Sequence, residues 1–290
     1  MYRKKILFLI VMMGLAFGLY FVFIFNKTFF WDNTAFEEES VTVYIYEGDD
    51  FNKVMSVLTP LLKSPNDFVS AAQKKGYDIR VKSGKFIIRK KSNNNEIINI
   101  LRGKSLTVRV TFNNQERIED LAGRISMQIA PDSLSLLNAF IDPSFLDLKG
   151  FNNANALSMY IPNSYDFFWN TTAENFRDKM WDYYQRFWTE ARQEKAKNLG
   201  LTQLEVIDLA AIVQKETQKV DERPRVAGVY LNRIKRKMKL QADPTVIYAM
   251  KSEFKNFDTI IKRVLYKDLK IDSPYNTYKN RGLPPGPITM

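Results

Sequence analysis

The chain contains neither cysteine nor histidine among its 290 residues. The absence of cysteine excludes disulfide bonds and thiol nucleophiles, and the absence of histidine excludes Ser-His-Asp triads. Without both residue types, the usual ligands of a zinc site are also missing. Hydrolytic or lyase chemistry would therefore have to depend on carboxylate, lysine or tyrosine side chains, or on a bound cofactor.

Positive charge exceeds negative charge, with 43 lysine and arginine residues, 32 aspartate and glutamate residues and a net charge of +11. This excess is typical of a protein with an anionic partner such as nucleic acid, anionic lipid or an acidic polymer. It is also typical of a lysine-rich surface that only keeps a protein soluble. The cations are scattered and form no long block interleaved with aromatic residues, which favours the second interpretation.

Residues 6–25 form an apolar run without a charge. Twenty helical residues span about 30 Å, the thickness of the hydrocarbon core of a bilayer. Arg3, Lys4 and Lys5 precede the run, so we predict a cytoplasmic tail at residues 1–5 and an exported remainder. The run is too long for a typical signal peptide and ends without a small-x-small cleavage site, so we predict an uncleaved signal anchor. Export also argues against a nucleic-acid partner.

The exported part divides, by pattern, into a linker at residues 26–40 and two domains. A strand–turn–helix pattern recurs three times between residues 41 and 122, and we expect the three units to pack into one α+β domain at residues 41–150. The second unit, at about 78–104, has the spacing of a LysM-like module. Such modules bind aminosugar chains, but a spacer would show the same pattern.

Residues 151–290 predict a second, mixed α+β domain. The spacing of apolar residues predicts one long helix at 173–199, and a capping box at Thr202 and Glu205 predicts the start of another. The stretches 240–250 and 273–286 are rich in turn-forming residues and predict loops with strand fragments. The expected fold class is therefore α+β, with one N-terminal transmembrane helix, a small LysM-like domain and a mixed α+β catalytic domain.

Glu216 occupies an apolar position of its predicted helix. Leu209, Ile212 and Val213 form an apolar stripe, Glu216 is the next position on it, and Val220 continues it one turn later. A carboxylate in such a place is either paired or partly buried with a raised pKa, as a general acid requires. Alternatively, the helix leaves the core here and Glu216 is simply solvated.

Polar and aromatic residues concentrate in three clusters of the last third of the chain. Tyrosine rings stack on the faces of sugars, and amide and hydroxyl groups bind their substituents. Ordinary turn chemistry would explain each cluster alone. The clusters are Glu216-Thr217 with Asp221-Glu222; Asn232-Arg233 with residues 241–248; and Tyr275-Asn276-Thr277-Tyr278 with residues 282–286.

Four motifs follow one another in these clusters: IVQKET, ERPRVAGVYLNRIK, MKLQADPTVIYAM and SPYNTYKNRGLPPGPI. Together with YIPNSYDFFWNTTAENFRDKM upstream, they resemble the endolytic peptidoglycan transglycosylases, the MltG or YceG-like family. The family's catalytic glutamate lies in the IVxKET helix, and many members carry a second glutamate at the position of Gln214. Glutamine cannot donate a proton as an acid, so the resemblance implies that Glu216 is catalytic.

The resemblance implies a lyase with one acid/base residue and neither a cofactor nor a metal. Glu216 would protonate the bond between N-acetylmuramic acid and N-acetylglucosamine, then accept a proton from the 6-hydroxyl as a 1,6-anhydro end forms. Such cleavage of nascent strands would limit their elongation. Asp243 could instead act as a second carboxylate. The residues expected to bind substrate are Asn232, Gln241, Asp243, Thr245, Tyr248, Tyr275 and Asn276.

The implied location is the bacterial plasma membrane, crossed once, with the catalytic domain outside and glycan strands as partners. Cell-wall synthases are a further expected partner. Family members usually continue past the LPPGPI motif, so the resemblance implies that a chain ending at Met290 lacks part of the catalytic domain. Two other interpretations stay open: a non-catalytic wall-binding scaffold anchored in the membrane, and an exported binder of anionic polymers.

Overall fold

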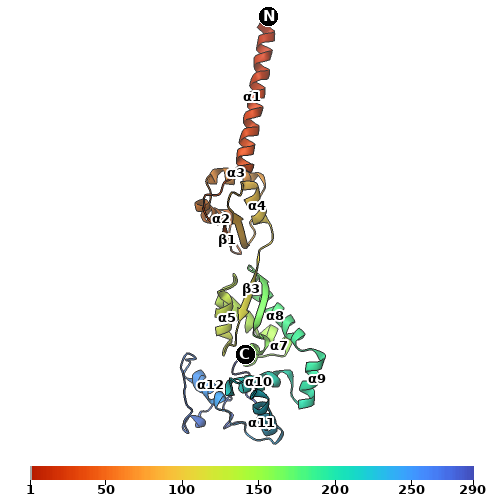
Figure 1. The fold of residues 1–290 in the computed structure, drawn as a ribbon, viewed down its shortest axis with the longest axis vertical. Helices are drawn as coiled ribbons and strands as arrows, with labels where there is room; N and C mark the ends of the chain where they lie inside the picture. Colours follow the sequence, from red (N-terminus) through yellow and green to blue (C-terminus); the bar gives the residue numbers. More distant parts are fainter. Residues whose placement is uncertain (1) are drawn as a thin grey trace. The chain divides into compact units, whose positions relative to one another are not determined.

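The computed structural model describes residues 2–290, and the chain forms two compact units (Figure 1). Unit 1 consists of residues up to Val108 with Phe168–Asn170, and unit 2 of Arg109–Phe167 with Thr171–Met290. The elements of unit 1 are α1 (Tyr2–Phe30), β1 (Ser40–Ile45), α2 (Phe51–Leu58), η1 (Thr59–Leu61), α3 (Pro65–Lys74), β2 (Gly84–Arg89) and α4 (Asn94–Arg102). The chain leaves unit 1 within β3 (Thr107–Phe112) and re-enters it briefly after β4 (Asn163–Phe168), the strand that pairs with β3.

Unit 2 is largely helical. Its helices are α5 (Ile118–Ser126), α6 (Ser133–Phe140), α7 (Pro143–Lys149), η2 (Ala156–Met159), α8 (Ala173–Phe187), α9 (Glu190–Leu199), α10 (Gln203–Glu216), α11 (Arg223–Lys235), α12 (Asp243–Glu253) and η3 (Asp268–Lys270). With the two short sheets, these elements confirm the mixed α+β fold that the sequence predicts.

Helix α1 packs at its C-terminal end against α3 and α4 of unit 1. It is the one helix in the described part of the chain that is long and apolar enough to cross a membrane, over Lys5–Phe30, a test that an N-terminal signal sequence also passes. At its end, Phe29 enters the core of unit 1. The Asn94 side chain of α4 donates a 2.8 Å hydrogen bond to the Thr28 carbonyl and accepts one of 2.7 Å from Asn33.

The expected linker at residues 26–40 is therefore wrong for most of its length. Asn33 and Thr34 are buried, and Thr34 forms a β-bridge with Leu62. Side-chain hydrogen bonds to distant residues, not a stripe of apolar residues, hold the segment in place. A local hydrophobic pattern does not reveal such bonds.

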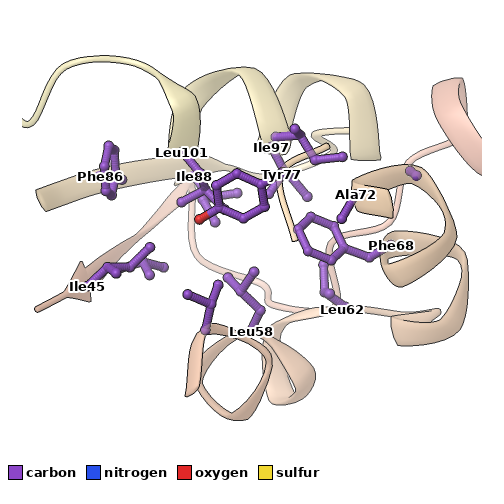
Figure 2. Packing of buried hydrophobic residues seen from close by; sticks show 14 of the residues in the cluster. Ile45, Leu58, Leu62, Phe68, Ala72, Tyr77, Phe86, Ile88, Ile97 and Leu101 are labelled. Carbon is purple, nitrogen blue, oxygen red and sulfur yellow. The ribbon is translucent and has the colours of Figure 1, made fainter. Parts of the chain in front are cut away.

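The core of unit 1 lies between a two-stranded sheet and three helices (Figure 2). Strands β1 and β2 pair antiparallel, with Val43 opposite Phe86. Apolar residues alternate along both strands, so one face of the sheet is buried. Side chains from α2, α3 and α4 cover this face; those labelled with the strand residues in Figure 2 include Leu58, Phe68, Ala72, Ile97 and Leu101.

The third strand–turn–helix pattern does not join this core. Strand β3 pairs with β4, and α5 packs against α6, so the division between units falls after Val108 and not near residue 150. The reason is that the sheet partner of β3 lies far along the chain, beyond the reach of the local pattern. The second pattern is present as β2 and α4, but its likeness to a LysM module stays a prediction.

Two expectations for unit 2 are wrong. The helix expected at 173–199 is two helices, α8 and α9, because the chain departs from helical geometry at Trp188 and Thr189. The loop expected at 240–250 is mostly helix α12. Its Asp-Pro pair occupies the first turn of that helix, a position that proline favours as much as it favours turns.

Candidate active site

Glu216 is the last residue of α10. The predicted capping box starts this helix: Thr202 Oγ1 accepts from the Glu205 amide at 3.2 Å, and Glu205 Oε2 accepts from the Thr202 amide at 2.7 Å. The apolar stripe of Leu209, Ile212 and Val213 is buried against α11 and α12. The helix then ends, so Val220 is not part of the stripe and is exposed.

The carboxyl group of Glu216 has a raised pKa. Although part of the side chain is open to solvent, neighbouring groups partly desolvate the carboxyl, and this is the largest cause of the increase. The negative charge of Asp243 raises the pKa further, while a hydrogen bond from Tyr230 and the charge of Arg233 oppose the increase. The position at a helix C-terminus also disfavours a negative charge. The balance of these effects raises the pKa of Glu216, in the direction that the helical pattern predicts.

Helix α11 supplies Tyr230 and Arg233 to this site. Its start is fixed by a 2.8 Å hydrogen bond from Thr217 Oγ1 to Glu222 and by Pro224 in its first turn. Tyr230 and Arg233 are three positions apart and so lie on one face of the helix. Tyr230 is buried, and its own pKa is raised by burial and by the nearby charge of Glu216.

Asp243 opens helix α12 and brings a second carboxylate near Glu216. An aspartate in the first turn interacts favourably with the helix dipole. Tyr278 donates a 2.6 Å hydrogen bond to Oδ1 of Asp243. Burial, that bond and the charges of Asp243 and Glu216 raise the pKa of Tyr278 to about 12. We call these five side chains the carboxylate cluster: Glu216, Tyr230, Arg233, Asp243 and Tyr278.

A solvent-open cavity of about 470 Å³ adjoins this cluster. Asp243 and Tyr278 form one side of it, and residues 262–266, including Lys262, Arg263 and the highly exposed Tyr266, form another. A cavity beside an acid with a raised pKa is a typical place for a reacting substrate.

Gln241 lies next to the cluster. It adopts a left-handed backbone conformation, with φ of 53°, and its amide donates a 3.1 Å hydrogen bond to the Thr277 carbonyl. Arg233 donates to the side chain of Gln241 at 3.4 Å and also to the Leu240 carbonyl. Gln241 is exposed, and its contact with substrate stays a prediction.

Thr245 and Asn276 are fully buried, so they do not face solvent as expected of residues that contact sugar. Thr245 Oγ1 lies 2.8 Å from the Thr277 hydroxyl and donates to the Ala242 carbonyl at 2.7 Å. The side-chain amide of Asn276 donates hydrogen bonds to two backbone carbonyls, those of Leu269 and Ile271. Thr245 holds the loop that carries Tyr278 against the start of α12, and Asn276 ties the same loop to residues 269–271.

The remaining predicted substrate-binding residues lie outside the carboxylate cluster. Tyr248 packs against Tyr275, with ring centroids 4.6 Å apart, and lines a separate cavity of about 280 Å³. Asn232 is exposed on α11, but two residues from Tyr230 it lies on a different face of the helix.

Gln214 also faces away from Glu216. Its side chain accepts a 3.1 Å hydrogen bond from Asn114. Among residues 2–290, no group of three or more acidic side chains is arranged to hold a metal ion.

The residues expected to act or to bind substrate do not include Tyr230, Arg233 or Tyr278, although the last two belong to the polar clusters. Tyr230 follows Val226 at helical spacing, so its position predicts an ordinary apolar face. Arg233 follows Tyr230 by one turn. A basic residue on an otherwise apolar helix face was the one feature of the sequence that could have indicated this part of the site. Tyr278 lies in the third polar cluster, but its pairing with Asp243 depends on a loop whose path the sequence does not predict.

Comparisons with known proteins identify the family of the chain. Residues 43–290 match the family model described as the YceG-like family. A protein of Bacillus subtilis named endolytic murein transglycosylase is 45% identical over 101 residues, which is 35% of this chain and 26% of that protein. A Streptococcus pneumoniae protein of the same name is 40% identical over 94 residues, 32% of this chain and 16% of that protein.

The matched segments thus span about a quarter or less of these two relatives. A crystal structure of a yceG-like protein from Listeria monocytogenes superposes with a TM-score of 0.55 and 25% identity. That comparison covers 87% of this chain and 86% of the other.

Proposed function

Because this chain belongs to the YceG-like family, we propose that it is a lytic transglycosylase that cleaves peptidoglycan glycan strands from within. The names of the Bacillus and Streptococcus relatives support this activity. The observation that carries it furthest is Glu216, a carboxyl group whose pKa is raised in part by Asp243, a residue that lines an open cavity. A single acid of this kind suffices for lytic cleavage, whereas hydrolysis generally requires two carboxylates.

In the first step, protonated Glu216 donates its proton to the glycosidic oxygen as the bond from the muramic acid C1 breaks. Positive charge then develops at that carbon. Tyr230 donates to the Glu216 carboxyl group and orients it. The ionised form that remains is stabilised by the same hydrogen bond and by Arg233, so the donor does not immediately take back the proton.

In the second step, the Glu216 carboxylate removes the proton of the sugar's own 6-hydroxyl, whose oxygen bonds to C1. The product is a 1,6-anhydro end, and Glu216 finishes the cycle protonated. No water is consumed. We place the sugar on the side of the cavity formed by Asp243 and Tyr278, with Gln241 within reach, while Thr245 and Asn276 hold the surrounding loops.

A second candidate is hydrolysis with Asp243 as the other carboxylate. Its charge is close enough to raise the pKa of Glu216, so it lies near the reacting atoms in our proposal. In that case Asp243 would activate a water molecule or attack C1, and the product would carry a free reducing end.

Helix α1 supports a proposal for where the protein is located in the cell. We propose that it crosses the plasma membrane once, with its basic N-terminal end in the cytoplasm and the rest of the chain outside. Catalysis beside the membrane would act on newly made strands, and cell-wall synthases stay a predicted partner.

The test is product analysis with the full chain in neutral detergent and isolated sacculi. We expect anhydro-muropeptides from the wild type and a loss of roughly 10²- to 10⁴-fold in Glu216→Gln, the usual worth of a general acid. Glu253→Gln, an exposed glutamate at the end of α12, is the matched control and should retain full activity.

Heavy-oxygen water separates the two reactions, because only hydrolysis places solvent oxygen in the product. Labelled reducing ends would replace the lytic proposal by the Asp243 alternative. If wild type and Glu216→Gln both release nothing, the chain is not catalytic in this form, and the scaffold interpretation would stand.

A further inference from the structure

A long open groove in unit 1, well separated in sequence from the carboxylate cluster, has no part in the proposed reaction. Its volume is about 880 Å³. Strand β2 forms one wall and helix α4 the other, and four cations line it: Arg89, Lys90, Lys91 and Lys104. We call this feature the basic groove.

The charge of the basic groove is largely available to a ligand. Lys90 pairs with Glu37 at 2.8 Å, but none of the ion pairs in residues 2–290 includes Arg89, Lys91 or Lys104, and all three are exposed. Glu96 is the one acidic residue of the lining, and its carboxylate already accepts from the Asn93 amide in the capping box of α4. Glu37, Glu38 and Glu39 lie close enough to act on Lys90, so we count only the other three cations. Three unpaired cations against one carboxylate in the lining favour an anion.

The cations are spread along the groove. Lys91 lies just before α4 and Lys104 just after it, and nine helical residues at 1.5 Å each separate these ends by about 13 Å. Cations spread over this length favour an extended ligand with several negative charges over a single phosphate or carboxylate.

The floor of the groove argues against sugars and nucleic acids. Among the described residues that line it, Phe86 is the only aromatic one, and it is 2% exposed. Both glycans and single-stranded nucleic acids bind through stacking on exposed rings. Exposed aliphatic side chains, Ile87 and Leu106, occupy that place instead.

The direction of the groove argues against a membrane surface as the ligand. Its Lys91 end adjoins the end of α1, since Asn94 holds Thr28. Its Lys104 end lies at the opposite end of β2, where the Leu106 amide donates to the Lys85 carbonyl. Lipid headgroups at the end of α1 would reach only the first cations, whereas a soluble chain can follow the whole groove.

We propose that the basic groove binds an extended, soluble polyanion of the phosphate-polymer class along β2 and α4. Three independent features meet in it: unpaired cations, a spacing that favours several anionic groups, and a floor without exposed rings. This binding is separate from catalysis by Glu216.

The test titrates the full chain, in neutral detergent micelles, with a fluorescent linear polyphosphate. The triple variant Arg89→Gln, Lys91→Gln, Lys104→Gln should bind roughly tenfold or more weakly, and the salt dependence of its binding should become shallower by about three contacts. The control triple Lys53→Gln, Lys74→Gln, Arg80→Gln removes the same charge from exposed positions outside the groove and should bind like the wild type. Orthophosphate should compete poorly.

Equal losses in the two triple variants would overturn the proposal, because binding would then follow net charge alone. Orthophosphate competing as well as the polymer would also overturn it. If only micelles doped with anionic lipid distinguish the groove variant from the control, the groove faces the membrane instead.

Discussion

The Tyr278 hydroxyl donates a 2.6 Å hydrogen bond to Oδ1 of Asp243. The Tyr230 hydroxyl, on helix α11, donates to Glu216. Each carboxylate of the cluster therefore has its own tyrosine. Because Asp243 raises the pKa of Glu216 and Tyr230 lowers it, the two neighbours can be tested separately through the pH dependence of activity.

Asp243→Asn should shift the alkaline limb of the kcat/KM profile to lower pH. The variant removes a negative charge that raises the Glu216 pKa, so Glu216 loses its proton, and with it general-acid activity, at a lower pH. Tyr278→Phe is the control, because it removes the hydrogen bond but keeps the Asp243 charge. If the alkaline limb of the Asp243→Asn profile stayed at the wild-type pH, the ionisation of Glu216 would not determine that limb.

Tyr230→Phe should shift the same limb in the opposite direction. The Tyr230 hydroxyl stabilises the ionised form of Glu216, so its loss raises the pKa of that carboxyl group and keeps the acid protonated to higher pH. The measurement is kcat/KM against pH for release of muropeptides from sacculi. A shift to lower pH would contradict the assigned hydrogen bond.

Asp208→Asn should make unit 2 more stable in alkali. Burial, and to a lesser degree the charge of Glu205, raise the Asp208 pKa to about 7, far above its unfolded value. Because the folded state binds the Asp208 proton more tightly than the unfolded state does, protonated Asp208 stabilises the fold. This contribution is fully present below pH ~4 and is lost as pH rises to about 7, a change of about 4 kcal/mol in the free energy of unfolding.

Urea unfolding at pH 5 and pH 8 measures this effect. The wild type should lose stability between the two pH values, and Asp208→Asn should lose much less. Asp221→Asn, an exposed control, should behave like the wild type. Parallel losses in wild type and Asp208→Asn would show that another group controls the dependence.

Gly286→Ala should destabilise unit 2 by about 2–4 kcal/mol, as overpacking against rigid backbone does. A Cβ at this position would overlap the carbonyl of Ala154, and neither segment can move freely because neighbouring Ile288 is in the core. Gly123→Ala, in helix α5 with open space around the new Cβ, should be neutral or slightly stabilising. Thermal unfolding of both variants compares the two, and equal melting temperatures would contradict the close approach.

Features encoded by neighbouring residues were predictable from the sequence. The capping box of Thr202 and Glu205 depends on residues within one turn, and the structure confirms it. The role of Glu216, which its helical phase suggested, stays a prediction. Features that depend on distant partners were not predictable. The Asp243-Pro244 pair marks a helix start and a turn equally well, and only the packing of α12 on α10 decides between them.

The same limit explains the binding residues. Thr245 and Asn276 have the side chains of sugar-binding residues, and these same groups satisfy buried backbone carbonyls. Composition identifies a polar loop, but burial decides whether its side chains face a ligand or hold the loop together.

Phe29 is buried in the core of unit 1, and Asn94 donates a hydrogen bond to the Thr28 carbonyl. A flexible linker at this place would let the apolar helix and the folded part move independently. Here the contacts of residues 28, 29 and 94 resist bending at the junction, so the segment after the apolar helix is not a free tether.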